Sequence, residues 1–178
     1  MNGQRGTILF LDDEPSILSA LRRTLRKEEY RLFFCQTPQE AFDVLEREEV
    51  DLVFSDHLMP EMTGLEFIEV VKELWPHVMR CILTGQADME LVVSAINKGN
   101  VHRFLVKPWN NVELKITISQ LFGQRALVQA NQELNEMVEA QRGRIKRLEH
   151  EHPGISAVRR DPTGVIIVDI DEGELKCA

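Results

Sequence analysis

The stretch that most restricts the fold of this chain is DLVFSD at residues 51–56, an apolar run that ends in a carboxylate. Three apolar residues in succession, at 52–54, are typical of a strand that is covered on both faces. Pro60 and Gly64 indicate that an irregular loop follows this strand. Ligand crevices of open α/β sheets lie beyond the carboxyl ends of the strands, so we expect Asp56 to lie in such a crevice.

The order of strand, polar turn and helix recurs along the first 123 residues. Thr63 and Glu66 fit a capping box, so the central strand and the helix after it form half of a parallel crossover unit. Apolar runs predict four further strands, at Thr7–Leu11, Arg31–Gln36, Met79–Leu83 and Phe104–Val106. The sequence therefore predicts an α/β fold with a doubly wound, five-stranded parallel sheet.

Caps and apolar spacing predict where the helices lie. Pro15 begins the first helix, and Thr37 with Glu40 predicts a capping box at the start of the second. The third helix is predicted to bury Leu65, Ile68, Val71 and Leu74, and Met89, Val92, Val93 and Ile96 recur at helical spacing in the fourth. Asn110 or Asn111 is available to cap the helix that follows the fifth strand.

From about Gln124 the apolar pattern changes to a period of seven, which predicts a coiled coil. Leucines dominate the d positions, where Gln141 is the polar member, and the a positions hold β-branched residues and a lone Asn131, a mixture that favours a parallel pair of helices. The predicted dimer seam consists of Leu127, Asn131, Leu134, Val138, Ile145 and Leu148. No proline interrupts residues 112–152, so a helix of about 40 residues, roughly 60 Å long, is expected.

The chain is thus expected to have three parts: a sheet domain at 1–123, a coiled-coil helix continuous with it at 124–152, and a tail at 153–178. Within the tail, residues 158–169 predict a short β-hairpin around Asp-Pro-Thr-Gly.

Composition narrows the function classes. A formal charge of −8 argues against broad contact with nucleic acid, and no apolar run approaches the roughly 20 residues of a membrane span. Three cysteines without close spacing suit reduced thiols, so we expect a cytoplasmic protein. The histidines are assigned no role, and His57 is expected to face solvent.

Five polar residues each follow an apolar strand, and they carry the predicted chemistry: Asp12, Asp13, Asp56, Thr84 and Lys107. Three carboxylates in one crevice repel each other, and an oxygen-only site that is open to water suits Mg²⁺. A carboxylate beside a divalent ion, a lysine and a hydroxyl is a plausible nucleophile towards phosphorus. Asp56 is the best candidate for that nucleophile.

These motifs resemble the response regulator receiver domains of bacterial two-component signalling. The resemblance rests on LDDE at 11–14, D-x-x-M-P-x-M-x-G at 56–64, LTG at 83–85 and KP at 107–108, and it covers roughly residues 5–122. It implies the flavodoxin-like strand order 2-1-3-4-5. It also implies that the chain accepts a phosphoryl group on Asp56 and uses Mg²⁺ to do so.

The resemblance assigns the remaining roles. Asp13 and Asp56 would bind Mg²⁺ with the backbone carbonyl of Leu58, and Asp12 would act mostly through water. The phosphoryl oxygens would be held by Thr84 and Lys107. The switch positions would be Thr84 and Phe104, and water access would be tuned at Leu58 and Gln86.

The function expected from these features is a response regulator that signals through dimerisation and protein contacts, not an enzyme. Its partners would be a sensor histidine kinase or phosphotransfer protein, an unknown downstream protein and a second copy of the chain, with no nucleic acid and no membrane. The alternative is a receiver input module of a larger phosphodiesterase or phosphatase, which the stretch at 84–109 resembles. A third possibility, a phosphotransferase for small metabolites, needs a substrate pocket that the sequence does not show.

Overall fold

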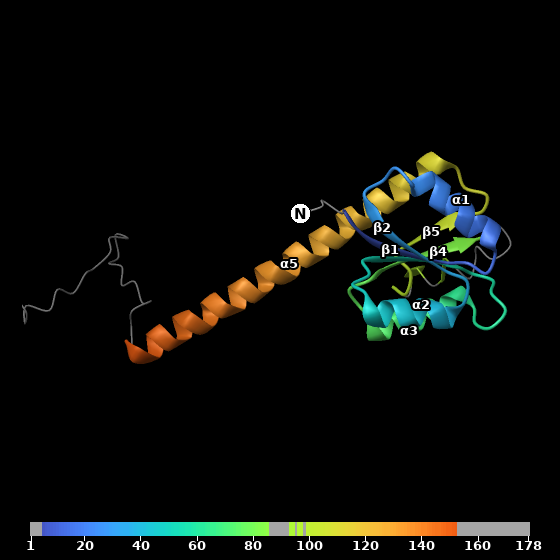
Figure 1. Cartoon of the computed structure of the whole chain (residues 1–178). Helices are drawn as coiled ribbons and strands as arrows, with labels where there is room; N and C mark the ends of the chain where they lie inside the picture. Colours follow the sequence, from blue (N-terminus) through green and yellow to red (C-terminus); the bar gives the residue numbers. More distant parts are fainter. Residues whose placement is uncertain (1–4, 86–92, 95, 98, 153–178) are drawn as a thin grey trace, which may run out of the picture. The chain divides into compact units, whose positions relative to one another are not determined.

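The computed structural model describes residues 5–85, 93–94, 96–97 and 99–152 (Figure 1). The chain divides into two units, residues 1–128 and 129–178. The hairpin expected at 158–169 lies outside the described residues, as do Met89 and Val92 of the expected fourth helix.

The first unit is built on a five-stranded parallel sheet with the order β2-β1-β3-β4-β5. The strands are β1 (Gly6–Leu11), β2 (Tyr30–Cys35), β3 (Leu52–Asp56), β4 (Met79–Thr84) and β5 (Arg103–Val106). This confirms the predicted fold class and strand order. The ends of the strands agree with the sequence prediction to within one residue, because apolar runs and flanking turn residues are local signals.

Among the helices whose bounds the structure describes, two lie on each face of the sheet (Figure 1). The helices α2 (Pro38–Arg47) and α3 (Gly64–Leu74) pack on one face, and α1 (Pro15–Leu25) and α5 (Asn111–Glu151) pack on the other. Successive residues of β1 alternate between the two cores: Leu9 packs with α2 and α3, whereas Phe10 packs with α1 and α5. All of β3 is buried, as expected for the central strand.

The capping box predicted for α3 is confirmed, whereas the one predicted for α2 is only half formed. The Thr63 hydroxyl accepts from the Glu66 amide at 3.3 Å, and Glu66 accepts from the Thr63 amide at 2.8 Å. At α2 the Thr37 hydroxyl also accepts from the amide of Glu40, but the Glu40 carboxylate accepts instead from the Gln36 amide, at 2.8 Å. Because β2 ends at Cys35, the Gln36 amide lies just past the strand and can donate to the Glu40 carboxylate.

The inner face of α3 differs from its prediction at one end. Ile68 and Val71 are buried, but Leu74 is 63% exposed and Phe67 is buried instead. The helix ends at Leu74, and the side chain of the next residue, Trp75, packs against the core in its place. The predicted burial of Leu74 was therefore wrong, because helical spacing cannot locate the last turn against the core.

The last helix has the length that the sequence predicted. α5 is a single helix of 41 residues, and the Asn110 side chain caps its first turn by accepting from the Glu113 amide at 2.7 Å. Its buried residues, Leu114, Ile118 and Leu121 among them, all lie in the first third of the helix. No helix among the described residues combines the length and apolar composition that a membrane crossing needs.

Candidate functional site

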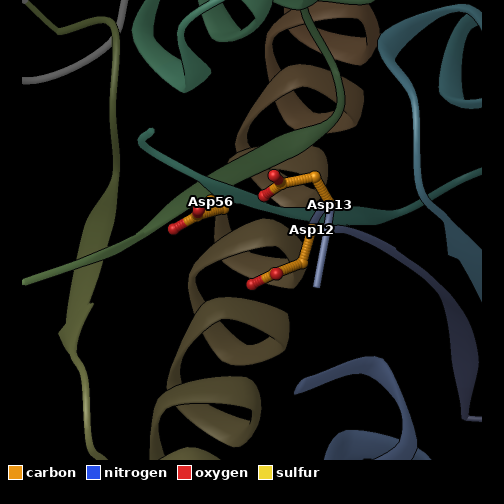
Figure 2. A group of neighbouring side chains, drawn as sticks. All are labelled: Asp12, Asp13 and Asp56. Atoms are coloured by element: carbon orange, nitrogen blue, oxygen red, sulfur yellow. The ribbon is translucent and has the colours of Figure 1, made fainter. Parts of the chain in front are cut away.

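Three carboxylates meet where β1 and β3 end. Asp12 and Asp13 follow β1 directly, and Asp56 is the last residue of β3. The two strands are neighbours in register, with Leu11 opposite Ser55, so their ends bring the three side chains together. One oxygen of each carboxylate lies within 4.8 Å of the others, and all three side chains project from the same edge of the sheet (Figure 2).

The three carboxylates differ in their access to solvent. Asp12 is fully buried, Asp56 is nearly so, and Asp13 is the most accessible of the three and only partly buried. Burial raises the pKa of Asp12, although Lys107 and the Glu14 amide, which donates at 2.9 Å, act in the opposite direction. The cluster is therefore closed on the Asp12 side and open on the Asp13 side. A hollow of roughly 200 Å³ lined by Asp13 lies at the open side.

Lys107 bridges two of the carboxylates. Its Nζ lies 2.7 Å from Asp12 Oδ2 and 2.7 Å from Asp56 Oδ1. Burial by itself lowers the pKa of Lys107, but the hydrogen bonds to Asp12 and Asp56 outweigh burial, so the pKa is raised and the ammonium stays charged. One ammonium cannot balance three ionised carboxylates.

The residues present fit a bound magnesium ion. The three carboxylates offer only oxygen ligands, and one of them is open to water, which Mg²⁺ retains when it binds proteins. Three ionised carboxylates and Lys107 have a net charge of −2, which one divalent cation would neutralise. Leu58, whose carbonyl was expected as a further ligand, follows Asp56 by two residues and is 62% exposed.

Thr84 and Phe104 lie on the two strands beyond β3. Thr84 ends β4 and is buried, and its hydroxyl donates to the carbonyl oxygen of Gly85 at 3.2 Å. The Thr84 carbonyl accepts from the Lys107 amide at 2.8 Å, so the backbone joins these two residues. Phe104 is partly buried against the core on the side of α2 and α3. Gln86 lies outside the described residues.

His57 is a correction to the sequence analysis. It was expected to face solvent, but it is only 4% exposed, and its Nδ1 is buried without a hydrogen-bond partner among the described residues. Its backbone amide donates to Leu83 and its carbonyl accepts from Gly64, each at 2.9 Å. His57 therefore joins β3, β4 and the start of α3. No local signal in the sequence distinguishes this packing from an exposed loop residue.

Gly64 allows the loop to return to the strand that carries Asp56. A Cβ at Gly64 would overlap the backbone carbonyl oxygen of Asp56 and would approach the Cα of His57 within 3.0 Å. Only a residue without a side chain permits this approach. The glycine of the D-x-x-M-P-x-M-x-G motif is therefore a packing requirement of the site.

Comparisons with known proteins show which family the chain resembles. The family described as the response regulator receiver domain matches residues 8–119. The hydrogenase transcriptional regulatory protein HoxA of Cupriavidus necator is 35% identical over 120 residues, which cover 67% of this chain and 25% of that protein. The alginate biosynthesis transcriptional regulatory protein AlgB of Pseudomonas putida is 28% identical over 93% of this chain and 36% of its own length. This chain thus spans about a quarter to a third of these curated relatives.

A solved structure has the same fold. The signal receiver domain of an HD domain-containing protein from Pseudomonas fluorescens Pf-5 superimposes with a TM-score of 0.67 and is 32% identical, covering 73% of this chain and 96% of that one. The match to the family covers more than half of the chain and includes β2 to β5 and all but the first two residues of β1. The resemblance inferred from the motifs is therefore confirmed, and the chain belongs to the response regulator receiver domain family.

Proposed function

We propose that this response regulator is phosphorylated on Asp56 by a sensor histidine kinase or a phosphotransfer protein. The observation that carries the proposal is the position of Asp56 at the end of β3, with Lys107 Nζ 2.7 Å away and two further carboxylates within 4.8 Å. A charged donor beside a carboxylate nucleophile is what phosphoryl transfer requires.

In the transfer, one Asp56 oxygen attacks phosphorus while the bond between phosphorus and the donor nitrogen breaks, and the electron pair of that bond stays on the imidazole. The Lys107 ammonium, which pairs with Asp56 before the transfer, then binds a phosphoryl oxygen. The Thr84 hydroxyl, which donates to Gly85, turns to donate to a second phosphoryl oxygen. Phe104 moves towards the core as Thr84 is displaced.

A magnesium ion bound by Asp13, Asp56 and the Leu58 carbonyl would supply positive charge that lets an anionic carboxylate and a phosphoryl group approach each other. Asp12 supports this arrangement from the buried side, because its Oδ2 is already 2.7 Å from Lys107.

The chain acts as a phosphoacceptor in this proposal, not as an enzyme that turns over an external substrate. The two curated relatives carry names of transcriptional regulators, which favours a response regulator over the alternative of an input module for a phosphodiesterase or phosphatase. What those relatives do as whole proteins extends beyond the quarter to third of their length that this chain covers.

We further propose that α5 pairs with α5 of a second copy as a parallel coiled coil. Support comes from the exposure of large apolar side chains along the helix, including Leu127 at 68% and Leu134 at 55%. Monomeric proteins rarely expose a continuous apolar stripe of this kind. The exposed seam residues are Leu127, Leu134, Val138, Ile145 and Leu148, with Asn131 among them.

Labelling with acetyl phosphate tests the central proposal. The wild-type chain should gain one phosphate in the presence of Mg²⁺ and none when the metal is chelated, whereas Asp56→Asn, which keeps the shape but removes the nucleophile, should gain none. Asp51→Asn is a matched control at the other end of β3 and should be labelled like the wild type. Equal labelling of Asp56→Asn and wild type would place the acceptor elsewhere.

A further inference from the structure

Arg125 of α5 binds at the N-terminal ends of the strands, whereas the carboxylate cluster lies at their C-terminal ends. Its Nη2 lies 2.7 Å from Oδ1 of Asp51, the residue just before β3. The other Asp51 oxygen accepts from the Thr7 amide of β1 at 2.8 Å. One carboxylate therefore binds β1 and α5 together at the start of β3.

Phe122, three residues before Arg125, provides a second contact at this edge. Its ring stacks on Tyr30 of β2 with centroids 5.3 Å apart and planes 3° from parallel. A Cβ at Gly6 would overlap the Phe122 ring, and the φ of +146° at Gly6 is one that other residues rarely adopt. The chain thus leaves space at the start of β1 for this aromatic ring.

These contacts lie where α5 stops burying side chains within the first unit. Leu121 is buried, Phe122 and Arg125 are partly buried, and residues 126–128 are exposed. The predicted seam begins at Leu127, two residues after Arg125. The two contacts therefore lie immediately before the part of α5 that we propose to dimerise.

We propose that Asp51, Phe122 and Arg125 form a clamp that holds α5 helical and fixed on the sheet at the point where the dimer seam begins. The clamp connects the seam to the start of β3. Asp56 lies at the other end of this strand, five residues after Asp51, or about 17 Å at 3.3 Å per residue. The connection to a seam rests on the proposed coiled-coil function, whereas the clamp itself does not.

Most exposed ion pairs contribute little, so this pair needs a reason to differ. The Arg125 and Asp51 side chains are only 29% and 18% exposed, and solvent screens such a pair less than an exposed one. Asp51 is also held in place by the Thr7 amide, so the pair forms without ordering a free carboxylate. For comparison, the Lys115–Glu28 pair that joins α5 to the turn between α1 and β2 is 46% and 26% exposed at the same distance of 2.7 Å.

Amide hydrogen exchange on the full chain tests the clamp. In an α-helix the amides of residues 126–128 bond to the carbonyls of residues 122–124, so release of the clamp should expose them. A Leu134→Asp background prevents a dimer from masking the effect. There, Arg125→Met, which keeps the apolar stem, should speed exchange at 126–128 by tenfold or more, whereas Lys115→Met should leave it unchanged. Unchanged exchange in Arg125→Met overturns the clamp.

A double-mutant cycle shows whether the two residues act as a unit. Asp51→Asn removes the charge but keeps an acceptor for the Thr7 amide, and it should speed exchange as much as Arg125→Met does. The double variant should show no further increase. Increases that multiply in the double variant would mean that the two side chains act separately, which contradicts a clamp.

Sedimentation without the Leu134→Asp change tests the link to the seam. Arg125→Met should weaken self-association severalfold, and Lys115→Met should not, because only the clamp adjoins the first heptad. Equal self-association of the two variants would contradict this link. A monomeric wild type would refute the proposed coiled coil, and the exchange result would still decide the clamp.

Discussion

Gly64 lies directly against the backbone carbonyl of Asp56, so the first residue of α3 and the last residue of β3 are in contact. The Gly64 amide also donates to the carbonyl of His57 at 2.9 Å. This contact fixes the point at which the loop after Asp56 packs back against the end of β3. It makes the position of the Asp56 carboxylate depend on a residue that carries no chemistry of its own.

Gly64→Ala should destabilise the fold by about 3 kcal/mol, since the added Cβ meets backbone that cannot move aside. Better helix propensity would offset about 1 kcal/mol at most. Denaturant unfolding measures the change. Gly123→Ala is the control: a Cβ there meets nothing within 4 Å, so it should stabilise α5 by up to about 1 kcal/mol. Similar effects of the two substitutions would contradict the contact.

Leu58→Asn should shorten the lifetime of the phosphorylated chain. Leu58 is exposed and follows Asp56 by two residues. We expect an apolar group there to keep water from the acyl phosphate, whereas an amide can bind and orient a water. Phosphate release after removal of acetyl phosphate measures the rate. Leu74→Asn, an equally exposed leucine at the end of α3, should leave the rate unchanged. Slower or equal decay in Leu58→Asn would refute the shielding role.

Leu134→Asp should give a monomer that still accepts phosphate on Asp56, because it introduces charge at a d position of the predicted seam without touching the acceptor. Analytical sedimentation and acetyl phosphate labelling measure the two properties. A Leu134→Asp chain that stays dimeric would show that the coil is not the dimer interface.

Asn131→Val should tighten self-association but admit assemblies other than the parallel dimer. A buried Asn at an a position costs stability, but it pairs with its mate only when the helices are parallel and in register. Sedimentation should show a tighter assembly with more than one species. A single dimer of unchanged affinity would mean that Asn131 is merely tolerated.

Stability should fall as the pH falls from about 6.5 to about 4, in part because of His102. Burial and the nearby Arg80 lower the pKa of His102 from 6.5 to about 4. The Arg80 amide donates to the Nδ1 of His102 at 3.1 Å. The unfolded chain takes up this proton near pH 6.5 and the folded chain only near pH 4. Within this window the unfolded state binds more protons, so acid favours unfolding.

His102→Asn keeps an acceptor for the Arg80 amide and removes the titration. Unfolding free energies between pH 4 and pH 7 should therefore depend less steeply on pH in this variant, by up to about 1.4 kcal/mol per pH unit for one proton. His77→Asn, at an exposed histidine, serves as the control. Identical pH profiles for wild type and His102→Asn would refute the assignment.

Local patterns in the sequence were sufficient for most of the fold. Apolar runs predicted all five strands, because helices cover both faces of the sheet and every strand carries apolar residues towards each face. The proline-free stretch of residues 112–152 predicted the length of α5. The motif residues also led to Asp12, Asp13 and Asp56, since each follows a strand and parallel strands end at one edge.

Only the tertiary structure decided which distant side chains touch. Lys107 and Asp12 are 95 residues apart in the chain, and their 2.7 Å contact depends on how β1, β3, β4 and β5 align. The burial of His57, the exposure of Leu74 and the pairing of Asp51 with Arg125 depend in the same way on packing between elements. A periodic sequence specifies the face that an element buries, but it contains no distance between elements. Those distances arise when the helices pack against the sheet, and they decide which polar groups share a site.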